Sequence, residues 1–262
     1  ALGSAGIQTS ALGFGGSSDT AITESWNGTS WTEVNDLNDG RTSTTGTGAS
    51  NTSALCFGGD SPPNTGATES WNGTNWTEVN NLNTARYFLA GGAPGNSDGI
   101  AFGGQTPSHI ANTETWDGTS WTEVADLSQT ANALGSANRS PSTLALAFGG
   151  IGGGSGVTSQ TEEWSFPSSP VVQEGQLWIK TATGTSSVMK GHQAAGTGAW
   201  ASGGALNTAR EILNSAGTQT ASLAYGGRSG GTQYAQTEKY NGTSWTEVND
   251  LNTGRFGIGG TG

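Results

Sequence analysis

The segment Thr23-Glu24-Ser25-Trp26-Asn27-Gly28-Thr29-Ser30-Trp31-Thr32-Glu33-Val34 decides the fold, because it recurs along the chain almost letter for letter. Further copies begin at Thr68, Thr113 and Thr237, the last with Lys-Tyr in place of Ser-Trp. The second Trp of each copy falls at position 31, 76, 121 and 245. The first three are 45 residues apart, so the gap before position 245 leaves room for one more unit. A period of this length is typical of stacked repeats.

The missing unit is present in altered form. It opens at Thr161-Glu162-Glu163-Trp164 and resumes at Gly198-Ala199-Trp200, and Trp200 lies 45 residues before Trp245. An aromatic-Gly-Gly step precedes every unit, at positions 14, 57, 102, 148 and 225. An Arg stands ten residues after the second Trp in four units, whereas the third has Ala131. Five repeats therefore make one domain of residues 1–262.

Each unit has the periodicity of strands. Ser53–Phe57 is a short apolar run that ends at Gly-Gly, and Thr68–Trp71 alternates before Asn72-Gly73, a strong signal for a two-residue hairpin turn. Alternation resumes over Trp76–Val79, and a fourth strand follows each Arg, as at Tyr87–Ala90. Four short antiparallel strands in each of five units predict an all-β, five-bladed β-propeller.

The order of these signatures resembles the kelch repeat. Arg41, Phe57-Gly58-Gly59, Glu69-Ser70-Trp71, Trp76 and Arg86 match it throughout the second unit. The resemblance covers all five units and implies a kelch-like propeller, although such propellers more often have six or seven blades. The near-identical units and the phrase at 174–178 also resemble Gly/Thr-rich repeat proteins of tailed marine bacteriophages.

Two segments compete for the innermost strand of the first blade. We expect the C-terminal segment 255–262 to supply it and so to close the ring. Residues 1–6 align with 212–217 and repeat the same strand, so one copy is surplus. The surplus copy is either a redundant end or, given that the chain does not begin with Met, the mark of a piece of a longer polypeptide.

The composition disfavours several classes of partner and of chemistry. The net charge of −11 disfavours nucleic acid and anionic membranes, and no apolar run is long enough to span a bilayer. One Cys and two His leave no cysteine zinc site and little for acid–base chemistry, so we expect no metal, cofactor or catalytic residue. Nine of the ten Trp and the recurring Glu and Arg occupy repeat positions, which indicates packing and structural ion pairs.

Two features depart from the repeat and are the candidate sites. The loop after each Gly-Gly varies in length and chemistry, and these loops should surround one channel mouth. The candidate ligand-binding residues of these loops are Asp60, Gln105, His109, Arg228 and Tyr234. The second feature is an inserted hairpin within 165–195 of blade four, a candidate protein contact. Its candidate residues are Trp178, Lys180, Lys190 and His192.

The sequence thus favours a non-enzymatic binding or structural module. The phage resemblance implies a virion or extracellular appendage, such as a tail fibre or receptor-binding protein, that engages a cell-surface glycan or a neighbouring protein. It could act as a homo-oligomer or within a longer chain. Two alternatives remain open: a polysaccharide-active enzyme with a carboxylate pair at the channel mouth, and a kelch-type adaptor for protein interactions.

Overall fold

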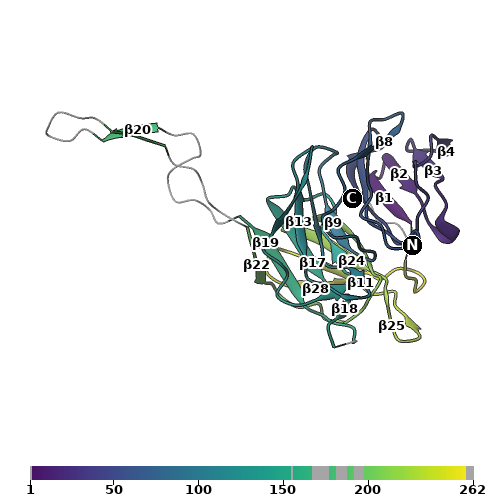
Figure 1. The fold of residues 1–262 in the computed structure, drawn as a ribbon. Coiled ribbons are helices and arrows are strands. Elements are labelled where there is room, and N and C mark those ends of the chain that lie inside the picture. The colour runs from purple at the N-terminus through teal and green to yellow at the C-terminus, as the bar shows by residue number, and fades with distance from the viewer. Residues whose placement is uncertain (1, 155, 167–176, 181–187, 192–197, 258–262) are drawn as a thin grey trace.

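The protein is a five-bladed β-propeller in which each blade is a four-stranded antiparallel sheet (Figure 1). The computed structural model describes residues 2–154, 156–166, 177–180, 188–191 and 198–257. Within these residues, one 3₁₀ turn, Ser17–Asp19, is the sole helical element. The blades follow one another along the chain, from purple at the first to yellow at the last. The fold class predicted from the repeats is confirmed.

Each blade runs from an inner strand at the central channel to an outer strand at the rim. Blade one contains β1 (Gly3–Ile7), β2 (Ser10–Phe14), β3 (Thr23–Trp26) and β4 (Trp31–Val34). Blade two contains β5 (Thr45–Ser50), β6 (Ser53–Phe57), β7 (Thr68–Trp71) and β8 (Trp76–Val79). Blade three contains β9 (Ala90–Gly92), β10 (Gly99–Phe102), β13 (Thr113–Trp116) and β14 (Trp121–Val124).

The last two blades repeat this plan. Blade four contains β16 (Gly135–Ser136), β17 (Leu144–Phe148), β19 (Thr161–Ser165) and β22 (Ala199–Ser202). Blade five contains β23 (Asn214–Thr218), β24 (Ala221–Tyr225), β27 (Thr237–Tyr240) and β28 (Trp245–Val248). Four short pairs lie outside the blades in the described part of the chain: β11 (Gln105–Thr106) with β12 (Ser108–His109), β15 (Ala131–Asn132) with β18 (Ile151–Gly152), β20 (Leu177–Lys180) with β21 (Val188–Gly191), and β25 (Arg228–Ser229) with β26 (Thr232–Gln233).

The turn between the two outer strands is longer than the sequence predicts. Trp71 pairs with Trp76, so four residues connect β7 and β8 instead of two. Asn72 Oδ1 accepts hydrogen bonds from the backbone N–H groups of Thr74 and Asn75, both at 2.9 Å. The Asn therefore closes the turn with its side chain as an acceptor, and Gly73 takes the positive φ of 94°.

The inner strand of blade one comes from the N-terminus, which corrects the expectation that the C-terminal segment supplies it. β1 pairs with β2 from Gly3–Phe14 to Ile7–Ser10. The two strands are joined by a tight connection, whereas pairing with the C-terminal segment would close a loop of nearly the whole chain. The local hairpin loses far less chain entropy. Of the expected closing segment, residues 258–262 lie outside the described part of the chain.

Small residues are required where inner strands of neighbouring blades meet. A Cβ on Gly46 of β5 would lie 2.5 Å from the backbone N of Ser4 in β1, which is closer than atoms can pack. Cys56 of β6 is fully buried, and its Sγ lies 3.1 Å from Thr44 Oγ1. Cys56 is therefore a small core residue. Crowding near the axis therefore accounts for much of the Gly and Ala content.

The blades are joined by one repeated set of contacts. The second Trp of a blade packs edge-to-face against the aromatic residue of the preceding blade, as Trp121 does against Phe57 with ring centroids 5.0 Å apart. The Nε1 of Trp121 donates to Thr68 Oγ1 of blade two at 3.0 Å. Equivalent Trp–Thr bonds of 2.9–3.1 Å join the other consecutive blades. The second Trp of blades two to five thus serves blade-to-blade packing, as the repeat predicts.

Buried ion pairs cross three of these junctions. Arg41–Glu69, Arg86–Glu114 and Arg210–Glu238 have N–O distances of 2.8, 2.8 and 2.9 Å, with side chains at most 1% exposed. Each Glu also accepts from an Asn of the preceding blade, as Glu114 does from the backbone N and Nδ2 of Asn83. The prediction that the recurring Glu and Arg form structural pairs is confirmed for these repeats.

Candidate functional site

The five variable loops lie at one end of the blades, each beginning at a Gly-Gly step. At the second loop, Gly58 and Gly59 have positive φ angles of 64° and 122°, and their N–H groups donate to Ala67 and Arg86. Four loops then pair with the segment that leads into the inner strand of the same blade. These pairs are Thr42–Asp60, Tyr87–Gln105, Asn132–Ile151 and Glu211–Arg228.

The same segments continue into a row of backbone hydrogen bonds at the channel. Phe88 N donates to Ser43 O, Ala133 N to Phe88 O, Ile212 N to Ala133 O and Gly257 N to Ile212 O, at 2.9–3.2 Å. All five residues have positive φ angles between 48° and 64°. Because the first four residues of this row each directly follow a residue paired to a variable loop, the loops flank this mouth of the channel.

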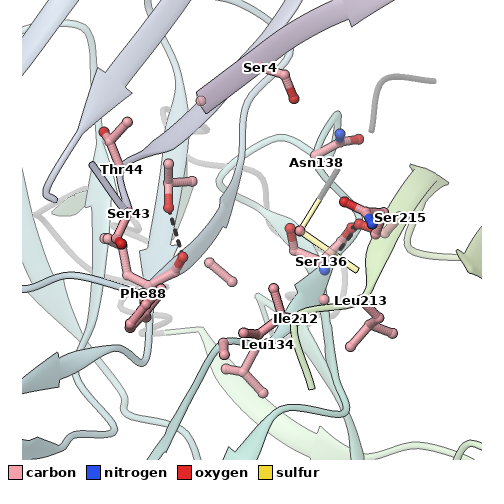
Figure 2. Close-up of a pocket in the computed structure, with 18 of the residues that line it drawn as sticks. Ser4, Ser43, Thr44, Phe88, Leu134, Ser136, Asn138, Ile212, Leu213 and Ser215 are labelled. Carbon is pink, nitrogen blue, oxygen red and sulfur yellow. Dashed lines mark hydrogen bonds between the residues drawn. The ribbon is translucent and has the colours of Figure 1, made fainter. Parts of the chain in front are cut away.

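The channel itself is a cavity of about 160 Å³ lined by residues from all five blades (Figure 2). Figure 2 shows Ser4, Phe88, Leu134 and Ser215 around the opening. Its hydroxyls are engaged with neighbouring strands, since Ser136 Oγ donates to Gly91 O at 2.8 Å and Ser215 Oγ donates to Ser136 O. No ionisable side chain is among the described residues of the lining, so the channel is a small neutral opening.

Two of the predicted ligand-binding residues come together at the third loop. Gln105 in β11 pairs directly with His109 in β12. Gln105 Oε1 accepts a hydrogen bond of 2.7 Å from Asn132 Nδ2 on the adjoining segment. His109 is half-buried. This hairpin is therefore anchored to the next blade and is a fixed part of the loop face.

The other three predicted residues lie on different loops. Asp60 pairs through its backbone with Thr42 and Asn64 of blade two's loop region. Arg228 forms a half-exposed ion pair of 3.1 Å with Glu211 and lies over the ring of Phe256 at 4.7 Å. The backbone N of Tyr234 donates to Gly227 O. All five predicted residues thus belong to the loop face, but none of them lines any of the four cavities in the described part of the chain.

A depression that the sequence did not single out lies between the second and third loops. It has a volume of about 350 Å³ and is lined by Pro63, Asn64, Ala85, Tyr87, Thr106 and Pro107. The half-buried Tyr87 ring packs against Phe88, with centroids 5.2 Å apart, which fixes its orientation. A rigid aromatic ring beside prolines, Asn and Thr offers both apolar and hydrogen-bonding contacts to a ligand. The sequence assigned Tyr87 to a strand, and only the packing of adjacent loops reveals the depression.

The inserted segment contains a hairpin of β20 (Leu177–Lys180) and β21 (Val188–Gly191). Trp178 pairs with Lys190, and Lys180 with Val188, so three of the predicted contact residues lie on its paired strands. His192 lies outside the described residues, as do Pro167 and Pro170 at the entry to the insertion. The predicted hairpin within the insertion is therefore present, and its role as a protein contact stays a prediction.

Among the described residues, no cluster of three or more His, Cys, Asp or Glu side chains could hold a metal ion. No helix there is long and apolar enough to cross a membrane.

Comparison with known proteins defines the fold alone. No family model and no curated protein matches the sequence. A solved structure described as "Structure of YjhT" is similar over 99% of this chain and 87% of its own, with a TM-score of 0.69 and 10% sequence identity. This likeness supports the propeller architecture.

Proposed function

We propose that this protein is a non-enzymatic binding module that engages a carbohydrate or a neighbouring structural protein through its variable loop face. The depression at Tyr87 carries the proposal. It lies where two variable loops meet, and it combines an oriented aromatic ring with amide and hydroxyl groups. A nearly invariant frame that carries divergent loops is the arrangement expected when the frame positions a recognition surface.

The setting we propose is a bacteriophage tail appendage, such as a tail fibre or receptor-binding protein, in the virion or extracellular space. This part rests on the resemblance of the Gly/Thr-rich units to repeat proteins of tailed marine phages. The acidic charge of −11 accords with a protein or neutral-glycan partner better than with nucleic acid. The inserted hairpin, with Trp178, Lys180 and Lys190, is the proposed contact to an adjoining protein.

The competing function is cleavage of a polysaccharide by two carboxylates at the channel mouth. Such an enzyme needs a proton donor and a second carboxylate about 5–9 Å apart on either side of the bond. The described lining of the channel contributes no carboxylate, and its hydroxyls are engaged in the sheet. A kelch-type protein adaptor would use the same loop face, and it differs from the favoured function in its ligand.

A glycan array probed with the purified chain tests the proposal. We expect binding that falls at least tenfold with Tyr87→Ala and less with His109→Ala or Tyr234→Ala, because only Tyr87 lines the depression. Thr246→Ala, at an exposed position on β28, is the matched control and should bind normally. Release of oligosaccharides from host polysaccharide would replace the proposal with the enzyme. Binding that is unaffected by Tyr87→Ala would rule out the depression.

A further inference from the structure

Blade one exposes a face that is buried or half-buried in every following blade. Trp31 is 49% exposed, whereas its counterparts Trp76, Trp121 and Trp245 are each 5% exposed. Glu24 is exposed as well, although its counterparts Glu69, Glu114 and Glu238 are buried to within 1%. Beside Trp31 lies a cavity of about 540 Å³, and all its described lining residues fall between positions 2 and 31. Blade five therefore does not cover this face.

The four internal junctions show what covers such a face. In each, the preceding blade contributes a Thr hydroxyl that accepts from the Trp and an aromatic ring against which the Trp packs. An Asn donates to the Glu in three of the junctions, and the backbone N of Ser128 does so in the fourth. For the Trp76 junction these are Thr23 at 3.0 Å, Phe14 with centroids 4.8 Å apart, and Asn38 at 2.8 Å. In three junctions an Arg completes the set.

Blade five has the Thr, Asn and Arg that would cover a following blade, but no Trp or Glu of a following blade contacts them in the described structure. Thr237 is 8% exposed, yet its Oγ1 has no hydrogen-bond partner in the described structure, whereas each of its four counterparts accepts a Trp N–H. Asn252 and Arg255 are exposed, and Arg255 Nε donates to Thr253 O within its own loop. Leu223 and Val248 on the same blade are 37% and 40% exposed. A buried hydroxyl left unpaired costs stability unless a donor reaches it.

We propose that the space between blade five and blade one is a docking seat for one further blade of the same repeat. Its Trp would donate to Thr237 Oγ1 and its Glu would accept from Asn252 and Arg255. Its own Thr, aromatic residue and Asn would cover Trp31 and Glu24. The two sides of this seat are the exposed faces of blade five and blade one of the same molecule. The occupant must therefore contact both, and needs two uncovered blade faces of its own.

A second copy of this chain does not meet that requirement. Its interior blades have both faces covered by their own neighbours, and its two end blades have one free face each. A single four-stranded blade of the same signature meets it fully. The occupant is therefore identified by the chemistry of its two faces: Trp and Glu on one, and Thr, aromatic, Asn and Arg on the other.

The test compares the chain as it stands with a chain that carries one more repeat. Arg255 is equivalent to Arg41, so position 262 corresponds to Gly48, and residues 49–86 appended after it continue the repeat in register. Hydroxyl-radical footprinting read by mass spectrometry reports the oxidation rate of Trp31 in both proteins. The control carries the same extension with Trp76→Ala and Thr68→Val in the appended copy.

We expect Trp31 to oxidise rapidly in the unextended monomer and about tenfold more slowly in the extended chain, in proportion to the exposures of 49% and 5%. The control extension should leave Trp31 reactive. Slow oxidation in the unextended monomer would overturn the proposal in favour of direct contact with blade five. A concentration-dependent dimer that protects Trp31 would identify a second copy instead. A folded, protease-resistant extension that leaves Trp31 reactive would contradict the seat itself.

Discussion

Trp121 Nε1 donates to Thr68 Oγ1 across the junction between blades two and three, over 3.0 Å and 53 residues of sequence. Both groups are buried, so the bond joins two blades where water does not compete. The indole also packs edge-to-face on Phe57. This combination fixes both the distance and the orientation of neighbouring blades.

Removing this Trp should weaken the whole propeller. We expect Trp121→Ala to lower the free energy of unfolding by about 3–5 kcal/mol, the usual cost of truncating a buried Trp. Thr68→Val should cost about 1–3 kcal/mol, because it leaves the indole N–H unpaired. Urea denaturation followed by circular dichroism measures both. Trp31→Ala is the matched control, and a loss as large as that of Trp121→Ala would contradict the exposed position of Trp31.

The buried ion pair Arg86–Glu114 should make the unfolding free energy sensitive to loss of the Glu114 charge. Glu114→Gln leaves the fully buried Arg86 guanidinium without its carboxylate, and we expect a loss of about 3–5 kcal/mol in unfolding free energy. Glu211→Gln at the half-exposed Arg228 pair should cost less than about 1 kcal/mol. Equal losses in chemical denaturation would show that burial does not govern these pairs.

The junction between blades three and four lacks its arginine. Ala131 stands at the Arg position, while Glu162 remains 9% exposed and accepts from Ser128 N at 2.9 Å. We expect Ala131→Arg to raise the unfolding free energy by about 1–3 kcal/mol through a charge-assisted bond to Glu162. The gain should vanish in a Glu162→Gln background, and a gain that persists there would have another origin.

Tyr240 gives the stability a dependence on alkaline pH. Burial, reinforced by the hydrogen bond that Tyr240 Oη donates to Glu163, raises the pKa of Tyr240 to about 12. In the unfolded chain its pKa is about 10. The folded state therefore holds this proton more tightly, and the stability it contributes is complete below pH 10 and is lost as the pH rises toward 12.

The Tyr240→Phe variant distinguishes the ionisation of Tyr240 from that of the other titratable groups. The variant keeps the ring packed on Trp245, at a centroid distance of 4.9 Å, but removes the ionisable hydroxyl. Urea denaturation between pH 9 and 11.5 should show a shallower decline for the variant than for the native chain. Absorbance at 295 nm follows the phenol directly, and a midpoint near pH 10 for Tyr240 would contradict the raised pKa.

The repeat made the architecture predictable, because recurring Trp, Gly-Gly and Arg positions each correspond to one fixed place in a blade. It could not identify the closing strand, since residues at both ends of the chain repeat the same segment. The cost of closing a loop decides between them, and this cost is not visible in a local pattern. The Asn-Gly turn was wrong in length because Asn72 can act either through its backbone or as a side-chain acceptor.

The loop face was predictable in position but not in detail. Asp60, Gln105, His109, Arg228 and Tyr234 were chosen because they break the repeat, and each does lie on a variable loop. The depression at Tyr87 depends on how two loops pack together, which single-loop comparison cannot reveal. The exposed face of blade one was hidden for the opposite reason. Its residues match the repeat, and only their missing neighbours distinguish them.

The row of backbone hydrogen bonds at the channel has a consequence for how this surface can change. Its five equivalent positions hold Ser43, Phe88, Ala133, Ile212 and Gly257, which share a conformation but no side-chain chemistry. The hydrogen bonds that link these five positions are made by main-chain atoms. Side chains of different polarity are therefore accepted at equivalent positions, and the polarity of the opening can change at one position while these bonds stay the same.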